Sequence, residues 1–407
     1  MERMRMSVVV ATILLAILAA APFSPVQAAD PIKIGLIVSL TGSQAKFGNM
    51  VYNSNLMAFE DAGIKEIDGR PIRFLTEDDQ GNPQTAKSAM EKLITMDKVD
   101  MVVGGYSSAA TAAMAGTAED LGCPMVIDCG SADEITTKPV KWVFSGPRVP
   151  ASHYGDALWG LLDEVIKPKT VALFYENTDW GTSSSKALRS GFVKRGIKIV
   201  FDQQYEAGAM SFKPMLSRIK AEKPDMVMAV SYLTDAIMLA KQMKEIRLNV
   251  PLYMGYAGGY TMPEFLDHQG KNVNFIASTT NWSPQAPWPG VKQYYDAYLK
   301  KFKSPPDYHG AQGYAAMQVA VDALKRAAKP ITRDSIREAL SKTDTMTVMG
   351  QIKHHEWEDN LGHHYYNQGL PLTYVIQWQK QKQEVVWPPD AKTANLIFPV
   401  PPYEKRE

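Results

Sequence analysis

The sequence predicts an α/β protein made of two similar units, each with a mostly parallel sheet. Strand patterns alternate with amphipathic helix patterns, as in parallel sheets whose strands are connected by helices. This alternation restarts near residue 151, which indicates a second unit. Of the 407 residues, 45% are hydrophobic and 21% are charged, so a sizeable core can form. About 378 residues remain after an N-terminal leader, a length typical of two domains.

The first unit opens with the apolar run Ile32–Val38, which has the composition of a buried strand. Apolar residues between Ala86 and Ile94 recur on one helical face. Ser107 or Ser108 can cap the alanine-rich helix that follows. Strands are expected at 32–38, 72–76, 100–103, 125–127 and 142–144, with helices at 50–61, around 86–94 and after 108.

The second unit repeats this architecture without repeating the sequence. Its first helix is closed by Gly196, a residue that commonly ends helices. Strands are expected at 170–175, 198–201, 225–230, 252–254 and 274–277, and helices at 184–195, 212–222 and 234–245.

The remaining residues, 281–407, are too few and too irregular for a third domain. They predict a loop at 281–290, helices at 293–301 and 310–328, a hairpin near 352–366, a strand at 372–377 and an extended tail from 391. We therefore expect a first lobe of 30–150 plus about 281–360 and a second lobe of 151–280 plus about 361–407. The chain would then cross between the lobes three times, forming a hinge that lets them close around a ligand.

Residues 1–29 have the organisation of a signal peptide. Arg3 and Arg5 precede an apolar run at 8–21, and small residues follow at Val26-Gln27-Ala28. The alternative is an uncleaved anchor, but the run is shorter than the about 20 residues that span a bilayer. We expect export to the periplasm as a soluble protein, with cleavage after Ala28 or Ala29.

Charge and cysteine content narrow the function further. The formal net charge of +1 argues against nucleic-acid binding and against electrostatic attachment to a membrane. The two cysteines, Cys123 and Cys129, flank a strand pattern that would hold them about 20 Å apart, too far for a disulfide. We expect two free thiols, whereas a turn between them would permit a bond.

A family resemblance rests on short motifs that occur in a fixed order along almost the whole chain. They are Ile32-Lys33-Ile34-Gly35, Leu40-Thr41-Gly42, Glu77-Asp78-Asp79, Val103-Gly104-Gly105, Asp179-Trp180-Gly181, Met254-Gly255 and Gly313-Tyr314-Ala315-Ala316. The sequence resembles the branched-chain amino acid binding proteins, periplasmic receptors of ABC importers. The resemblance implies a type I periplasmic binding protein: two Rossmann-like lobes joined by a three-strand hinge. It also implies a monomer without cofactor or enzymatic activity, which delivers a small molecule to an ABC permease and its ATPase.

The strand ends of the first unit offer an anion-binding site. Ligands of open α/β sheets bind beyond the carboxyl ends of strands. Ser108 lies where such an end meets a helix N-terminus, whose free N–H groups suit a carboxylate. The resemblance implies that Ser108, Gly130 and Ser131 hold the ligand's carboxylate. The alternatives are an ordinary N-cap for the first and turn chemistry for the other two.

Aromatic residues supply the rest of the predicted pocket. The resemblance implies that five of them line it: Phe47, Tyr106, Trp180, Tyr232 and His309. A role in the core is the alternative for each.

One departure from the family pattern bears on the ligand. Amino-acid binders hold the ligand's ammonium with a glutamate just after a Met-Gly pair, and Ala257 stands at that position here. A buried ammonium without an anionic partner costs several kcal/mol. Either another acid replaces the glutamate, from among Asp179, Asp235 and Glu264, or the ligand has no ammonium. We favour the second, a small hydrophobic or aromatic carboxylate.

Two further features of the sequence concern a disulfide and a metal site. The family's disulfide positions are occupied by Gly81 and Ser107, so packing alone would hold the first lobe.

Four histidines cluster at His354-His355 and His363-His364, where zinc or copper is conceivable. Adjacent strand residues face opposite sides, so at most two or three could converge. We favour a solvated hairpin without metal.

Two rival classes remain. The sequence has no hydrolase signature and no dinucleotide fingerprint after its first strand, which argues against an enzyme. A sensor of the same fold, feeding a membrane receptor, is the closer alternative. The lack of a fused membrane segment favours a free-standing transport component.

Overall fold

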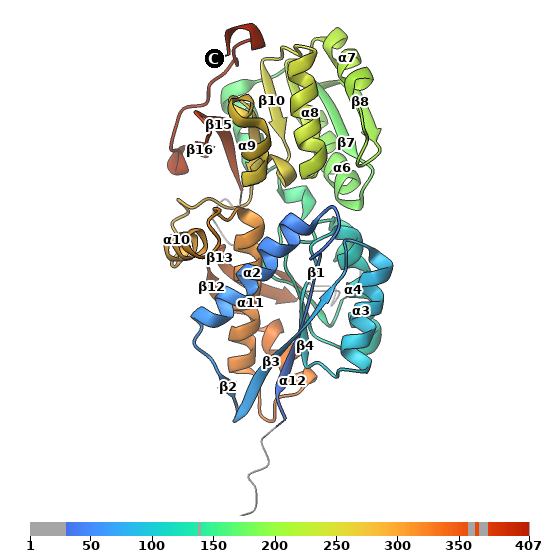
Figure 1. Cartoon of the computed structure of the whole chain (residues 1–407), viewed down its shortest axis with the longest axis vertical. Coiled ribbons are helices and arrows are strands. Elements are labelled where there is room, and N and C mark those ends of the chain that lie inside the picture. The colour runs from blue at the N-terminus through green and yellow to red at the C-terminus, as the bar shows by residue number, and fades with distance from the viewer. Residues whose placement is uncertain (1–29, 137–139, 357–362, 366–372, 407) are drawn as a thin grey trace, which may run out of the picture.

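The computed structural model describes residues 30–136, 140–356, 363–365 and 373–406. The predicted signal peptide lies outside the described residues. Two lobes are stacked along the long axis of the molecule, each with its own sheet and covering helices (Figure 1). Within the described ranges, no helix combines the length and the apolar character needed to cross a membrane.

The sheet of the first lobe has a parallel centre with antiparallel edges. Fully buried aliphatic residues fill its central strands, as expected of parallel strands covered on both faces. In sheet order the strands are β12 (Asp344–Thr347), β13 (Gly350–Glu356), β14 (His363–Tyr365), β6 (Val143–Ser145), β5 (Met125–Ile127), β4 (Met101–Gly104), β1 (Ile32–Val38), β3 (Arg70–Asp78) and β2 (Glu66–Ile67).

Helices of the first lobe lie on both sides of this sheet (Figure 1). On one side α2 and α11 pack against each other, and on the other α3 packs on α4. The helices are α2 (Ala45–Asp61), α3 (Pro83–Thr95), α4 (Ser108–Leu121), α10 (Val291–Phe302), α11 (Tyr308–Arg326) and α12 (Arg333–Ser341).

The second lobe has the same plan. Its sheet contains β16 (Lys382–Trp387), β15 (Tyr374–Gln379), β11 (Ala277–Thr280), β10 (Leu252–Gly255), β9 (Met226–Val230), β7 (Thr170–Glu176) and β8 (Lys198–Tyr205), in that order. The first two are antiparallel additions at one edge. Its helices are α5 (Asp156–Leu161), α6 (Asp179–Lys194), α7 (Lys213–Glu222), α8 (Leu233–Glu245) and α9 (Pro263–Gln269).

These sheets confirm the predicted α/β class. The strands change sheets between β6 and β7, between β11 and β12, and between β14 and β15. The assignment of residues to lobes stays a prediction.

Several predicted boundaries were wrong for local reasons. Helix α6 begins at Asp179, five residues before the expected start, because the Thr178 side chain accepts a hydrogen bond from Gly181 N and caps it. Strand β11 begins three residues later than expected, since a 3₁₀ turn at Gly270–Val273 and a left-handed Phe275 (φ 76°) precede it. Sequence patterns also missed α5, α9, α12, β12 and β16.

Cys123 and Cys129 are free and buried on either side of β5, which confirms the prediction of two thiols. Burial raises the pKa of Cys123 to about 12, so this thiol stays protonated and unreactive.

The picture of a solvated histidine hairpin was wrong for His354. This residue is buried, and its ring nitrogens lie 2.6 Å from Leu340 O and 3.2 Å from Ser145 O. Its imidazole therefore binds main-chain carbonyls in the first lobe. No three metal-ligating side chains converge within the part of the chain that the structure describes. The side chains of His355, His363 and His364 lie outside the described set.

Candidate ligand-binding site

A small cavity lies between the two lobes, at the carboxyl ends of the central strands. Its volume is about 20 Å³, room for about one water molecule. A solute of several heavy atoms therefore needs the lobes to move apart before it can enter. The wall contains Tyr106, Ser108, Cys129, Ser131, Tyr154, Trp180, Tyr232, Gly258, Tyr308 and His309.

Six of the nine predicted site residues belong to this wall: Tyr106, Ser108, Ser131, Trp180, Tyr232 and His309. Phe47 lies behind it, with its ring 5.0 Å from Tyr106 and 4.8 Å from His309. Gly130 and Ala257 each neighbour a wall residue in sequence but are not part of the wall themselves.

Four wall residues were missed by the sequence analysis. Cys129, Gly258 and Tyr308 are immediate neighbours of predicted residues, so the strand-end argument could have included them. Tyr154 follows a short 3₁₀ turn, Ala151–His153, at the start of the second lobe. No motif marked it, because its position depends on how the two lobes meet.

Two hydrogen bonds orient the Ser108 hydroxyl so that it can donate into the cavity. Its Oγ accepts from the N–H groups of Ser131 (3.1 Å) and Ala132 (3.0 Å). Both bonds use lone pairs of the oxygen, so the hydroxyl hydrogen remains for a third partner. A carboxylate placed here would receive that hydrogen at the N-terminus of α4.

The other predicted anion contacts are arranged differently from the expectation. The N–H of Gly130 donates to Gly105 O (2.9 Å), and that of Ser131 donates to Ser108. The Ser131 hydroxyl donates to Cys129 O (2.6 Å) and lies 2.7 Å from the Tyr154 hydroxyl. In this conformation these main-chain N–H groups are already used within the protein, and so is the Tyr154 hydroxyl hydrogen, which Ser131 Oγ accepts. The donors left facing the cavity include the Ser108 hydroxyl and the Tyr106 phenol, which has no partner among the described residues.

Four phenol groups contribute to the wall, and all stay neutral. Burial raises the pKa of Tyr154 to about 12 and holds those of Tyr106, Tyr232 and Tyr308 well above the ordinary range. The Tyr308 hydroxyl accepts from Gly258 N (3.0 Å). Neutral hydroxyls can donate to an anion without any lysine or arginine in the wall.

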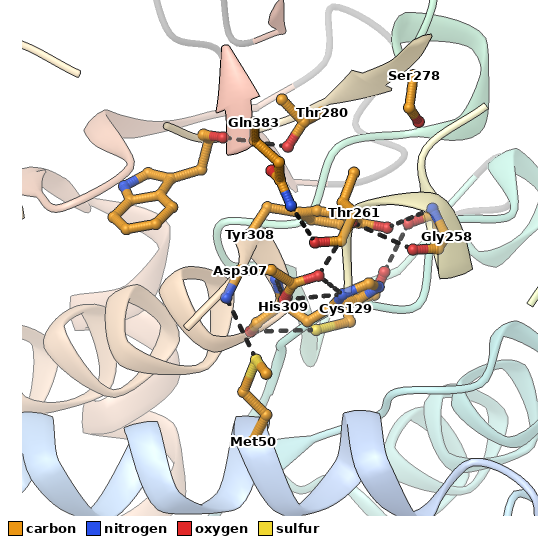
Figure 2. A network of polar contacts seen from close by, with 12 residues as sticks. Met50, Cys129, Gly258, Thr261, Ser278, Thr280, Asp307, Tyr308, His309 and Gln383 are labelled. Carbon is orange, nitrogen blue, oxygen red and sulfur yellow. Dashed lines mark hydrogen bonds and ion pairs between the residues drawn. The ribbon is translucent and has the colours of Figure 1, made fainter. Parts of the chain in front are cut away.

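An Asp307–His309 pair stands at the start of α11 (Figure 2). Asp307 Oδ1 accepts from His309 N (2.9 Å), and Oδ2 lies 2.8 Å from His309 Nδ1. Thr261 of the second lobe donates to Oδ2 (3.0 Å), and Gln383 Nε2 donates to Thr261 O (2.7 Å). The pair is buried, and its hydrogen bond with Thr261 connects the first lobe to the second.

No acidic side chain belongs to the described wall of the cavity. Among the possible replacements for the missing glutamate, Asp235 accepts from Gly208 N (3.0 Å) and Glu264 lies 3.9 Å from Lys46. Asp179 lines a different groove, between α4 and α6. Ala257 is fully buried and takes a left-handed conformation (φ 53°).

Glu176 is buried next to the site rather than in it. It accepts from Tyr232 N (2.8 Å) and from the Thr178 hydroxyl (2.8 Å). Burial raises its pKa to about 8 despite these bonds. It therefore fixes the strand end that carries Tyr232 without presenting a full negative charge to the cavity at neutral pH.

Comparison with known proteins gives a consistent result. A sequence model of the periplasmic binding protein family matches residues 31–382. A Leu/Ile/Val-binding protein homologue of Brucella suis is 25% identical over 390 residues, covering 91% of this chain and 95% of that protein.

Among solved structures, a leucine-binding protein of Thermotoga maritima has 22% identity and a TM-score of 0.77, covering 87% of this chain and 97% of that one. A solute-binding protein of Rhodopseudomonas palustris, in complex with 3,4-dihydroxybenzoic acid, has 21% identity and a TM-score of 0.76, with coverage of 88% and 95%. The chain therefore belongs to the periplasmic binding protein family and has the type I fold of its branched-chain amino acid receptors.

Proposed function

We propose that this protein is the periplasmic solute-binding component of an ABC importer and that it captures a small aromatic carboxylate by lobe closure. One observation carries the proposal: the described wall of the cavity offers hydroxyl donors and aromatic faces but no carboxylate. The protein would act without a cofactor or catalysis and would deliver its solute to a permease and its ATPase.

The absence of an acid from the wall argues against an α-amino acid. A buried ammonium needs an anionic partner, and leaving it unpaired costs several kcal/mol. Two carboxyl groups lie next to the wall, and both are already hydrogen-bonded: Asp307 accepts from Thr261 and from two N–H groups of His309, and Glu176 accepts from Tyr232 N and Thr178. An anion without an ammonium suits the wall better. The ligand in the Rhodopseudomonas palustris complex is such an anion.

Contacts between the lobes suggest how closure is stabilised. Asp133 N donates to Ser183 Oγ (3.1 Å), and Lys186 binds Glu134 (2.8 Å) on one side of the cavity. On the other side, Gly258 N donates to Tyr308. A solute favours the closed form only through contacts that it makes better there than in the open form. Trp180 and Tyr232 approach from the second lobe and would supply those contacts.

A ligand screen tests the proposal directly. Benzoate and related aromatic acids are expected to raise the melting temperature of the mature protein, because a ligand at 100 times its Kd adds about 2.7 kcal/mol of stability. Leucine, isoleucine, valine and short amides are expected to have little effect. Strong stabilisation by leucine together with none by the aromatic acids would contradict the proposal.

Replacing Ser108 by alanine is expected to weaken binding of the best aromatic acid by roughly 1–3 kcal/mol, because a buried carboxylate loses a donor. The matched control is Ser107→Ala. Ser107 caps α4 by accepting from Ala110 N, so its loss should lower stability by about 1 kcal/mol and leave affinity unchanged. Calorimetric titration of both variants separates the roles. If both variants lose the same affinity, Ser108 does not bind the ligand's carboxylate.

A further inference from the structure

The Tyr106 hydroxyl is buried in the cavity wall and has no hydrogen-bond partner among the described residues. Only 4% of the residue is exposed, so bulk water does not satisfy the hydroxyl. Its ring is fixed by Phe47, which stacks on it, and by Tyr232 at 6.1 Å. A buried hydroxyl without a hydrogen bond is energetically unfavourable. A polar ligand group that forms a hydrogen bond with it in the cavity would therefore bind more tightly.

His309 offers a second polar group in the same cavity wall. The rings of Tyr106 and His309 lie 5.5 Å apart, and both line the cavity. Because a carboxylate oxygen only accepts hydrogen bonds, the Nδ1 atom that faces Asp307 carries the ring hydrogen. In the neutral imidazole this leaves Nε2 as an acceptor. The wall therefore pairs a hydroxyl that can donate with a nitrogen that can accept.

We infer that Tyr106 and His309 together recognise a hydroxyl group on the ligand, so that the solute is a hydroxylated aromatic carboxylate. The inference rests on the proposed function, since it takes the carboxylate to bind near Ser108. The ligand's O–H donates to His309 Nε2 while its oxygen accepts from the Tyr106 hydroxyl. A hydroxyl is a small neutral group that donates and accepts through a single atom.

Other substituents fit this pair less well. A second carboxylate would find no positive side chain in the described wall, and a methyl group would leave the Tyr106 hydroxyl unsatisfied. A water molecule can occupy the cavity before binding, given its volume of about 20 Å³. A ligand that displaces such a water without replacing its hydrogen bonds loses affinity. The site thus discriminates against isosteres of similar size.

The test compares benzoate, the three monohydroxybenzoates and the three methylbenzoates on the mature protein and on Tyr106→Phe, by calorimetric titration. One hydroxybenzoate is expected to bind the wild-type protein at least about 10-fold more tightly than the methylbenzoate of the same ring position. Tyr106→Phe is expected to lose about 5- to 20-fold for that hydroxybenzoate and less than about 2-fold for benzoate.

The melting temperatures of the ligand-free variants show whether a substitution affects folding rather than binding. Tyr106→Phe deletes an oxygen without a described partner, so the ligand-free variant should melt no lower than the wild type. Tyr294→Phe is the matched control: it removes a buried hydroxyl that lies 2.9 Å from Ser54 Oγ, away from the cavity. It should lower stability and leave all affinities unchanged.

The outcomes separate the two proposals. If benzoates bind but Tyr106→Phe weakens benzoate and hydroxybenzoate equally, the hydroxyl inference is overturned while the proposed function stands. The same holds if no hydroxyl is preferred over methyl at any ring position. If no aromatic acid binds at all, both proposals fall.

Discussion

Replacing Gly258 by alanine is expected to weaken binding of aromatic acids by at least about 100-fold, which corresponds to about 2.7 kcal/mol. Gly258 has a left-handed backbone (φ 58°), which costs a residue with a Cβ roughly 1–2 kcal/mol. A Cβ there would lie 2.6 Å from Ser231 O and 2.6 Å from the Trp180 ring. Both neighbours are fully or almost fully buried, so neither can move away easily.

Three features of the site would be disturbed at once. The shift needed to relieve the clash moves the Gly258 N–H that donates to Tyr308, one of the contacts that join the lobes. It also displaces Trp180, whose ring lies 5.0 Å from that of Tyr232. The segment that follows carries Thr261, which donates to Asp307. The closed arrangement of the wall should therefore become less favourable.

A substitution at a second glycine distinguishes the effect of backbone strain from the effect of the steric clash. Gly208 is also left-handed (φ 79°), but a Cβ there would meet nothing within 4 Å. Gly208→Ala is expected to lose roughly 1–2 kcal/mol of stability through strain alone and to keep its affinity. Fluorescence titration and urea denaturation of both variants give the comparison. If Gly258→Ala binds as tightly as Gly208→Ala, Gly258 has no role in shaping the cavity.

The parts of this structure that could be predicted from the sequence are those set by local patterns. The strand Ile32–Val38 is buried apart from the half-buried Lys33, and its limits were predicted correctly. The expectation for Ser108 and Ser131 followed from their place at the ends of parallel strands, and both belong to the wall. Such positions depend on the register of one strand and one helix, which the sequence specifies within a few residues.

The parts that could not be predicted depend on tertiary contacts. Tyr154 reaches the cavity because its hydroxyl meets Ser131 of the first lobe, a contact between segments with no shared motif. Helix α6 begins early because one threonine side chain caps it, and its polar first turn has no apolar periodicity to reveal it. The Ser131 N–H donates to Ser108 Oγ, and this hydrogen bond depends on how two loops approach each other. Periodicity and spacing carry no information about such approaches.

Asp128→Asn is expected to make the ligand-free protein more stable above about pH 6, by about 3–5 kcal/mol near pH 8. Asp128 is fully buried at the end of β5. Its Oδ2 accepts from Asn55 Nδ2 (3.2 Å), and its Oδ1 has no partner among the described residues. Burial raises its pKa from an ordinary 3.8 to about 8, although the bond from Asn55 opposes the rise.

The direction of the pH dependence follows from this raised pKa. Between about pH 4 and pH 8 the unfolded chain has released the Asp128 proton while the folded protein still holds it. Unfolding therefore releases a proton, and the stability that Asp128 contributes is largest at low pH and is lost as the pH rises toward 8. An asparagine has nearly the same shape as the protonated acid and does not titrate, so its advantage over aspartate should grow steadily with pH.

A group with the opposite shift provides the control. Burial tends to raise the pKa of Asp78, but hydrogen bonds from Thr41, Gln80 and Leu40 outweigh it, and the pKa is lowered. Its contribution to stability is present at neutral pH and is lost only as the pH falls toward and below the ordinary pKa of 3.8. Asp78→Asn should therefore be less stable, with a deficit that stays nearly constant from pH 8 to about pH 5. Urea denaturation of both variants and the wild type between pH 4 and 8 measures the differences. A difference for Asp128→Asn that does not change with pH would mean that the carboxyl is already ionised in the folded protein, and that the buried end of β5 tolerates a charge beside the cavity.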